Sequence, residues 1–267
     1  MKQKITRREF IKVSSAIGAG LALGNYSVLA EAKLSGSLKL RTLGRTKLGV
    51  TELSFGGAYL NSPAPLHLAI DRGVNLIHTA PNYTGSQSIE VVSDVMTTRR
   101  QEVFLALKEE PVSEEVGKAL QQLNTDYVDI LVPPFQSVDA ISNPELEGAY
   151  ETLKNEGKIR FSGFSCHYNM VVVMKKAIEL GFFDVMLIRY NLNNSERLKP
   201  ILAEAKRKQN MGFIAMKVVQ PFKDTPEEIP EVIKNTIKNR NVDSLLIGMA
   251  NLDEVNANVD VLSVGKP

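Results

Sequence analysis

The sequence predicts an α/β protein, a TIM (β/α)8 barrel with an N-terminal β-hairpin, preceded by a signal peptide. After Lys33, eight short apolar runs rich in β-branched residues alternate with amphipathic helical stretches. Most runs are continuously apolar and do not alternate with polar residues, so both faces of each predicted strand are expected to be covered. Eight strands, each followed by a helical pattern, favour a closed parallel barrel.

The elements are predicted in chain order. A hairpin over residues 39–50 is expected to close the floor of the barrel. The expected strands are 52–56, 75–79, 102–108, 127–132, 161–165, 184–190, 212–218 and 244–248. The helical patterns fall at 113–123, 144–155, 194–209, 226–239 and 252–262. An open doubly wound sheet is the structural alternative, but no Gly-x-Gly-x-x-Gly turn follows the first strand.

The N-terminal segment reads as an export signal. Residues 6–12, "TRREFIK", resemble the twin-arginine motif, and Ala30-Glu31-Ala32 has the small-x-small form of a signal peptidase site. We therefore expect residues 1–32 to be a twin-arginine signal peptide and residues 33–267 to be the mature barrel. The expected location is periplasmic or otherwise exported, the expected partner is the twin-arginine export machinery, and no stable membrane span remains if the signal is cleaved. An uncleaved amphipathic or membrane-anchoring helix is the alternative.

Composition excludes several classes of protein. Residues 1–32 carry five basic and two acidic side chains, so the net charge of +2 belongs to that segment and the remainder is −1. The single cysteine, Cys166, excludes an intramolecular disulfide framework and a cysteine-cage metal site. No basic patch or aromatic-rich strand suggests nucleic acid. No His, Asp or Glu pair has metal-ligand spacing, so no metal site is expected.

In a barrel of this kind the chemistry lies at the carboxyl ends of the strands. Polar residues at or just beyond those ends are the candidates for a functional site. They are His78, Tyr83, Lys108, Ser165, Cys166, His167, Asn191, Lys217 and Asn251.

Several ordered motifs resemble the aldo/keto reductase family. They are "LRTLGRTKLGVTELSFGG", "AIDRGVNLIHTAPNY", "VFLALK", "LNTDYVDIL", "LKNEGKIRFSGFSCH" and "LLIGMANLDEVNAN", which together span roughly residues 38–262. The resemblance implies a TIM barrel that reduces an aldehyde or ketone with NADP or NAD as cofactor. The expected partner is a small-molecule carbonyl substrate.

The resemblance also implies roles for individual residues. Tyr83 matches the family's proton donor, and Lys108 matches the lysine that lowers the pKa of that phenol. His78 stands at the position of a family aspartate, and Pro134 stands at the position of a family histidine. With the carboxylate gone, we expect Tyr83 to become more acidic.

The resemblance places the cofactor across the barrel mouth, near Ser165, Lys217, Gly248 and Asn258. Other positions depart from the family pattern. Cys166 and Leu187 replace partners of the carboxamide, and Glu254 replaces an arginine that grips the 2′-phosphate of NADP. NADP and NAD therefore both stay open. Lys217 either meets a phosphate or is a solvated lysine of the barrel rim.

His78 has three interpretations. It packs at the barrel mouth without a role, or it hydrogen-bonds Lys108 while neutral, or it is an acid–base group or a metal ligand with His167 or Cys166. Cys166 is expected to be a packing residue, and His67 to be structural. Two functions follow: an exported carbonyl reductase, or an inert barrel that binds a small metabolite or a partner protein.

Overall fold

The computed structural model describes residues 38–263, and eight parallel strands in it close into a barrel. The strand order is β10-β3-β4-β5-β6-β7-β8-β9, and the β10–β3 pairing closes the ring. The predicted closed barrel is therefore confirmed, and the open sheet is excluded. The strands are β3 Leu53–Gly56, β4 Leu76–Thr79, β5 Phe104–Leu107, β6 Val128–Leu131, β7 Ile159–Cys166, β8 Val185–Arg189, β9 Gly212–Met216 and β10 Ser244–Gly248.

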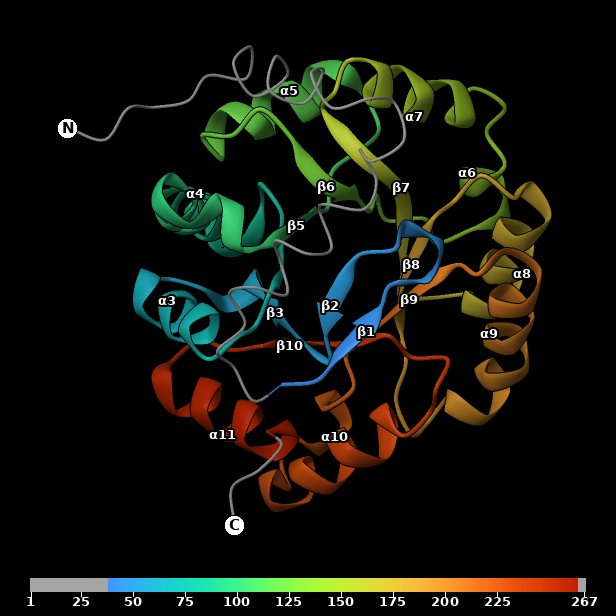
Figure 1. The fold of residues 1–267 in the computed structure, drawn as a ribbon. Helices are drawn as coiled ribbons and strands as arrows, with labels where there is room; N and C mark the ends of the chain where they lie inside the picture. The colour runs from blue at the N-terminus through green and yellow to red at the C-terminus, as the bar shows by residue number, and fades with distance from the viewer. Residues whose placement is uncertain (1–37, 264–267) are drawn as a thin grey trace, which may run out of the picture. The chain divides into compact units, whose positions relative to one another are not determined.

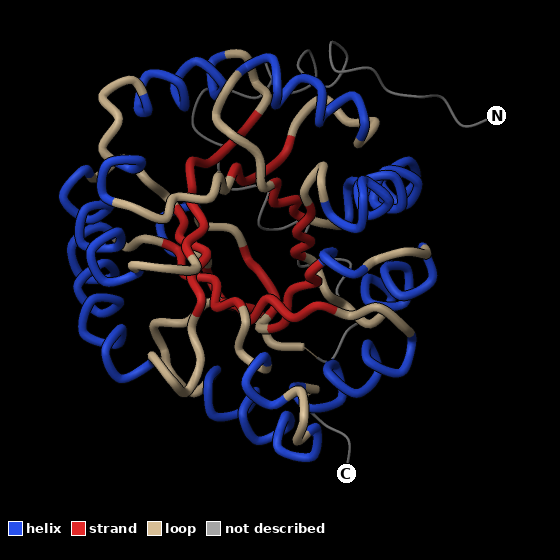
Figure 2. Tube along the Cα trace, turned by 180° about the vertical axis from the view of Figure 1, so that it is seen from behind, coloured by secondary structure: helices blue, strands red, loops and turns tan. Residues whose placement is uncertain are grey.

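Helices surround this ring of strands, as Figure 2 shows. Each predicted helical pattern contains a helix, although the pattern at 226–239 divides into a 3-10 turn, Pro226–Glu228, and α10. The helices are α3 Pro63–Asp71, α4 Gln87–Arg99, α5 Ser113–Gln122, α6 Val138–Ile141, α7 Leu146–Asn155, α8 Met170–Leu180, α9 Ser195–Gln209, α10 Ile229–Ile237 and α11 Leu252–Leu262. No helix among residues 38–263 is both long and apolar enough to cross a membrane.

Two hydrophobic clusters divide the barrel into an outer and an inner core. The outer cluster packs the helices against the outward faces of the strands. The inner cluster fills the lumen with side chains such as Leu76, Ile130 and Ile214. Because successive residues of a strand point to opposite faces, a strand can supply both clusters, as β4 does with Ile77 in the outer cluster and Leu76 in the inner one. This explains why the runs in the sequence are continuously apolar.

The N-terminal hairpin closes the amino end of the barrel, as predicted. Its strands are β1 Leu40–Thr42 and β2 Gly49–Thr51, which lie across the barrel in Figure 1. Leu43 and Leu48 belong to the inner cluster and plug the lumen. Between the strands, Gly44 has φ +49°, and a Cβ there would lie 2.2 Å from the backbone nitrogen of Gly212. Only glycine permits that approach.

Ion pairs fix the hairpin to the loops that lead into the strands. Arg45 Nε lies 2.8 Å from Asp184 Oδ1, just before β8. Arg41 pairs with Glu52 and also donates to the carbonyl oxygen of Val242, before β10. The hairpin thus occupies the amino end, which leaves the carboxyl ends of the strands as the open mouth. The predicted signal peptide, residues 1–32, lies outside the described residues.

Candidate active site at the barrel mouth

The alternation of side chains brings polar groups to the open end of the lumen. Residues two positions beyond the inner cluster keep its inward direction. On β4, β5 and β8 this alternation reaches a histidine, a lysine and an arginine: His78, Lys108 and Arg189. On β7 it reaches Ser165 and His167. The sequence analysis did not name Arg189, although the alternation from Val185 through Leu187 was a signal that could have found it.

His78 is a buried imidazole with an unsatisfied nitrogen. Its side chain is 4% exposed, and its Nε2 has no hydrogen-bond partner among the described residues. Burial, the charge of Lys108 and the neighbouring His167 lower its pKa from 6.5 to about 3. His78 is therefore neutral near pH 7. The second of the three interpretations, a hydrogen bond between His78 and Lys108, is not present in the structure.

Tyr83 and Lys108 lie beside His78. Tyr83 begins a 3-10 turn, Tyr83–Ser86, and its ring centroid is 5.7 Å from that of His78 at an interplanar angle of 57°. The Lys108 Nζ lies 5.6 Å from the Tyr83 ring centroid. The three side chains that the sequence proposed as catalytic are thus neighbours. They come from β4, from the loop after β4 and from the end of β5.

The expected acidification of Tyr83 is wrong for this structure. Burial, and secondarily the nearby Tyr59, raise the pKa of Tyr83 to about 12. The Lys108 ammonium group lies 5.6 Å from the centre of the Tyr83 ring, and its charge does not offset the effect of burial on the Tyr83 pKa. Burial and the like charge of Lys217 in turn lower the pKa of Lys108, while Glu109 and Glu110 oppose that shift.

Tyr59 joins the mouth from the 3-10 turn Gly57–Tyr59, and sequence reasoning missed it. Its side chain is 61% exposed, and its ring covers Gly248: a Cβ on Gly248 would meet Tyr59 Cδ2 at 3.2 Å. Tyr59 also acts on the pKa of Tyr83. Tyr59 is therefore close to the predicted cofactor residue Gly248 and acts electrostatically on the predicted proton donor.

The predicted carboxamide site is mostly apolar. Ser165 is 1% exposed, and its hydroxyl is 3.4 Å from the carbonyl oxygen of Pro133. Cys166 is fully buried in the outer cluster, its S–H donates to the carbonyl oxygen of Tyr168, and burial raises its pKa to about 11. Cys166 is a packing residue, as expected. Leu187 presents an apolar side chain to the lumen.

Glu254 and Asn258 have structural partners in α11. The Glu254 carboxylate accepts from the backbone N–H of Ala250 at 2.8 Å and from the Asn251 amide at 2.9 Å. Asn251 caps the helix by accepting from the backbone N–H of Glu254. The Asn258 amide donates to the carbonyl oxygen of Glu254. The acidic group is therefore held at the helix N-terminus, where negative charge is stabilising.

A glutamine positions the loop that carries His167. The side-chain oxygen of Gln136, beyond β6, accepts from the backbone N–H groups of His167 and Tyr168 at 2.9 and 3.0 Å. Burial, followed by the charges of Lys108, Lys217 and Arg189, lowers the pKa of His167 to about 4. Two neutral imidazoles and three cations thus share the mouth.

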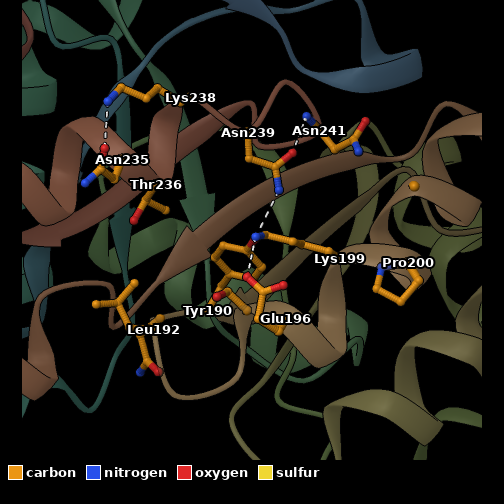
Figure 3. A pocket seen from close by; sticks show the side chains of 13 residues that line it. Tyr190, Leu192, Glu196, Lys199, Pro200, Asn235, Thr236, Lys238, Asn239 and Asn241 are labelled. Atoms are coloured by element: carbon orange, nitrogen blue, oxygen red, sulfur yellow. Dashed lines mark hydrogen bonds and ion pairs between the residues drawn. The ribbon is translucent and has the colours of Figure 1, made fainter.

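A separate pocket of about 650 Å³ lies between α9 and α10 (Figure 3). Of the site residues that the sequence predicted, Asn191 lines this pocket and the others do not. Its polar groups pair with one another: the Asn239 amide donates to the Tyr190 hydroxyl at 3.0 Å, and Lys199 pairs with Glu196. Within residues 38–263, no group of three or more His, Cys, Asp or Glu side chains is arranged to hold a metal ion.

Comparisons with known proteins agree with this fold. The model of the Aldo/keto reductase family matches residues 58–231. The chain is 29% identical to the uncharacterized oxidoreductase YqkF of Bacillus subtilis, over 62% of this chain and 61% of the relative. It is 24% identical to L-galactose dehydrogenase of Arabidopsis thaliana, over 83% of this chain and 87% of the relative.

Solved structures show the same fold. Aldo-keto reductase AKR11C1 from Bacillus halodurans, in its holo form, superposes with a TM-score of 0.74 at 22% identity, over 86% of this chain and 92% of that one. An aldo/keto reductase from Klebsiella pneumoniae in complex with NADP and acetate gives a TM-score of 0.70 at 19% identity, over 86% of this chain and 92% of that one.

Proposed function

Because the chain belongs to the aldo/keto reductase family, we propose that it reduces an aldehyde or ketone with a nicotinamide cofactor. The observation that carries this proposal is the juxtaposition of Tyr83, Lys108 and His78 at the barrel mouth. Two relatives, one named an uncharacterized oxidoreductase and the other an L-galactose dehydrogenase, support the reaction class.

In this proposal a bound nicotinamide cofactor supplies the hydride, and the protein supplies the proton. Tyr83, with a pKa raised to about 12, is fully protonated near pH 7 and can donate its proton to the carbonyl oxygen. The Lys108 ammonium group lies 5.6 Å from the ring centroid, and its charge does not offset the effect of burial on the Tyr83 pKa. The raised pKa keeps the donor protonated before the reaction and disfavours the phenolate that forms when the proton leaves.

His78 contributes a neutral hydrogen-bonding group. Its Nε2 is buried without a partner, and an unpaired buried polar atom is costly. A carbonyl oxygen bound beside Tyr83 would satisfy Nε2 when that nitrogen carries the hydrogen. His78 would then orient the substrate, as the histidine replaced by Pro134 does in the family, while its low pKa keeps it from acting as a cationic acid.

The residues present fit NAD better than NADP. The Glu254 carboxylate is fixed at the start of α11 by hydrogen bonds to Ala250 and Asn251. A fixed negative charge at this position repels a 2′-phosphate, whereas an acid accepts the 2′-hydroxyl of NAD favourably. Gly248 and Asn258 would line the rest of the site for the dinucleotide. A relative from Escherichia coli is named an NADH-specific methylglyoxal reductase, which is consistent with this preference.

Titration of the purified mature protein with NADH and NADPH, followed by cofactor fluorescence, tests the proposal. We expect saturable binding with tighter affinity for NADH than for NADPH. We expect Glu254→Gln to reduce the difference between the two affinities.

Tyr83→Phe should lower turnover of a generic aldehyde by roughly 100-fold or more while cofactor affinity stays nearly unchanged. Tyr168→Phe is the matched control, since it removes a phenol from a side chain that is 64% exposed. Full activity in Tyr83→Phe would assign the proton to another group.

A second candidate function is an inert barrel that binds a small metabolite. The observations that favour it are the unpartnered Nε2 of His78 and the raised pKa of Tyr83. Both are consistent with a site whose proton-transfer geometry has been lost. Absence of any saturable change with either cofactor, up to roughly millimolar concentration, would favour this function over the reductase.

The N-terminal segment supports a further proposal, that the protein is exported by the twin-arginine pathway to the periplasm. The support is the motif at residues 6–12 and the cleavage pattern ending at Ala32. The intact mass of the exported protein should correspond to a chain that begins at Lys33. Replacement of Arg7 and Arg8 by lysine should leave an unprocessed precursor in the cell. Normal processing of that double variant would refute the assignment.

A further inference from the structure

The barrel mouth collects the partly buried cations that lack a carboxylate partner. Among residues 38–263, every other partly buried arginine or lysine forms an ion pair within 4.0 Å. The three exceptions have no such pair. They are Lys108, Arg189 and Lys217. The paired cations are Arg41, Arg45, Arg72, Arg99, Arg100, Lys154, Lys158, Arg160, Lys176 and Lys206.

These three cations come from different strands and act on the same space. Lys108 follows β5, Arg189 ends β8 and Lys217 follows β9. All three lower the pKa of His167, and Lys217 also lowers that of Lys108. Lys217 has φ +60°, a left-handed conformation that residues other than glycine rarely adopt. Strained backbone of this kind is typical of functional sites.

Like charges that converge in a half-buried space repel one another, so the free protein maintains this arrangement at a cost. An anion placed among them removes the repulsion and gains charge-assisted hydrogen bonds. A guanidinium group is suited to a planar, bidentate acceptor such as a carboxylate or phosphate. The mouth is therefore built for a ligand with a negative group close to Tyr83.

We propose that Arg189 and Lys217 bind the carboxylate or phosphate group of a carbonyl substrate, so that the enzyme acts on acidic aldehydes or ketones. The inference rests on the proposed reductase function and names the substrate class of that site. Lys108 stays with Tyr83, as part of the proton-donating pair. Arg189 and Lys217 are specificity residues, because they hold the acid group and leave the carbonyl to Tyr83 and His78.

Lys217 was also predicted to meet the cofactor, whose diphosphate is a second source of negative charge. Lys217 directly follows Met216, the strand partner of Arg189, and its charge acts on Lys108 and His167, so we assign it to the acid group of the substrate. Arg189 favours the acid group of a substrate over the cofactor diphosphate as the anion at this site. Its charge also acts on His167, and the resemblance matched it to no cofactor contact of the family.

Binding of malonate, measured by titration calorimetry at low ionic strength, tests the site without requiring turnover. We expect saturable binding to the wild-type protein, weakened roughly tenfold or more in Arg189→Gln and in Lys217→Gln. Arg197→Gln, an exposed cation on α9, is the matched control and should bind as the wild type does. All variants are checked by circular dichroism. Absence of malonate binding to the wild type, or equal loss in the control, overturns the proposal.

Two further measurements separate the sources of the anion. NADH and malonate should bind together, and Arg189→Gln should leave NADH affinity within about twofold. Competition between NADH and malonate, together with a loss of NADH affinity in Arg189→Gln, would assign the cations to the cofactor and overturn the substrate proposal.

In turnover, succinate semialdehyde should have a KM roughly tenfold or more below that of its methyl ester, and Arg189→Gln should abolish that difference in KM. Malonate binding without any turnover would refute the reductase function alone.

Discussion

Replacing His78 tests how the mouth is built, through the pH dependence of stability. In the folded protein, burial and the neighbouring cation lower the pKa of this imidazole to about 3 from the ordinary 6.5. Between those values the unfolded chain binds a proton that the folded chain does not bind. The free energy of unfolding therefore falls as the pH falls from about 6.5 toward about 3. His78→Leu removes this contribution.

The size of the effect follows from the two pKa values. One pKa unit corresponds to about 1.36 kcal/mol. Going from about pH 7.5 to about pH 5, an imidazole of ordinary pKa in the unfolded state takes up most of a proton, and His78 takes up almost none in the folded state. The stability lost through this group is therefore about 2 kcal/mol. The pKa of His167 is lowered as well. His167 is present in both the wild type and His78→Leu, so its contribution largely cancels when the two proteins are compared.

Urea denaturation followed by circular dichroism, at about pH 7.5 and about pH 5, measures the difference. We expect His78→Leu to lose about 2 kcal/mol less than the wild type on acidification. At the higher pH the variant should be at least as stable, because it removes a buried nitrogen without a partner. His67→Leu, on α3, is the control that should keep the wild-type slope. An unchanged pH dependence in His78→Leu would show that this imidazole titrates freely.

Two further predictions concern the scaffold. Gly44→Ala should destabilise the protein by about 3 kcal/mol or more in urea denaturation, because a Cβ at φ +49° would overlap the backbone of Gly212. Gly49→Ala is the control and should have little effect, because its Cβ would have no neighbour closer than 3.9 Å. Asp129→Ala should cost about 3–5 kcal/mol, since it leaves two partly buried guanidinium groups without their carboxylate; the exposed Asp126→Ala is its control, and similar losses in the two variants would contradict the reasoning.

The sequence predicted which polar side chains meet at the barrel mouth better than it predicted their electrostatics. The strand ending in His78 and the turn into Tyr83 were readable because a buried strand rarely ends in an imidazole, and Lys108 was readable from its position after a strand. Whether the lysine would lower the pKa of the phenol depended on distance and burial, which the sequence does not contain. Burial prevailed, and the pKa of Tyr83 rises to about 12.

The residues predicted to bind the cofactor were also only partly understood from the sequence. The acid at Glu254 was visible, and so was its conflict with a 2′-phosphate. Its hydrogen bonds to Ala250 and Asn251 were not inferred, although the spacing of Asn251 and Glu254 fits a helix cap. Tyr59 was missed because its ring reaches Gly248, a residue far along the chain.

The sequence by itself determined the closed barrel, the hairpin at its floor and the family, because the period of apolar residues and the order of motifs are local properties of the chain. The tertiary structure decided which charged groups meet. Arg189 ends β8 and Lys217 follows the neighbouring strand β9, but their convergence with Lys108 and His167 depends on closure of the barrel. Electrostatic coupling acts through space, so only the folded chain reveals it.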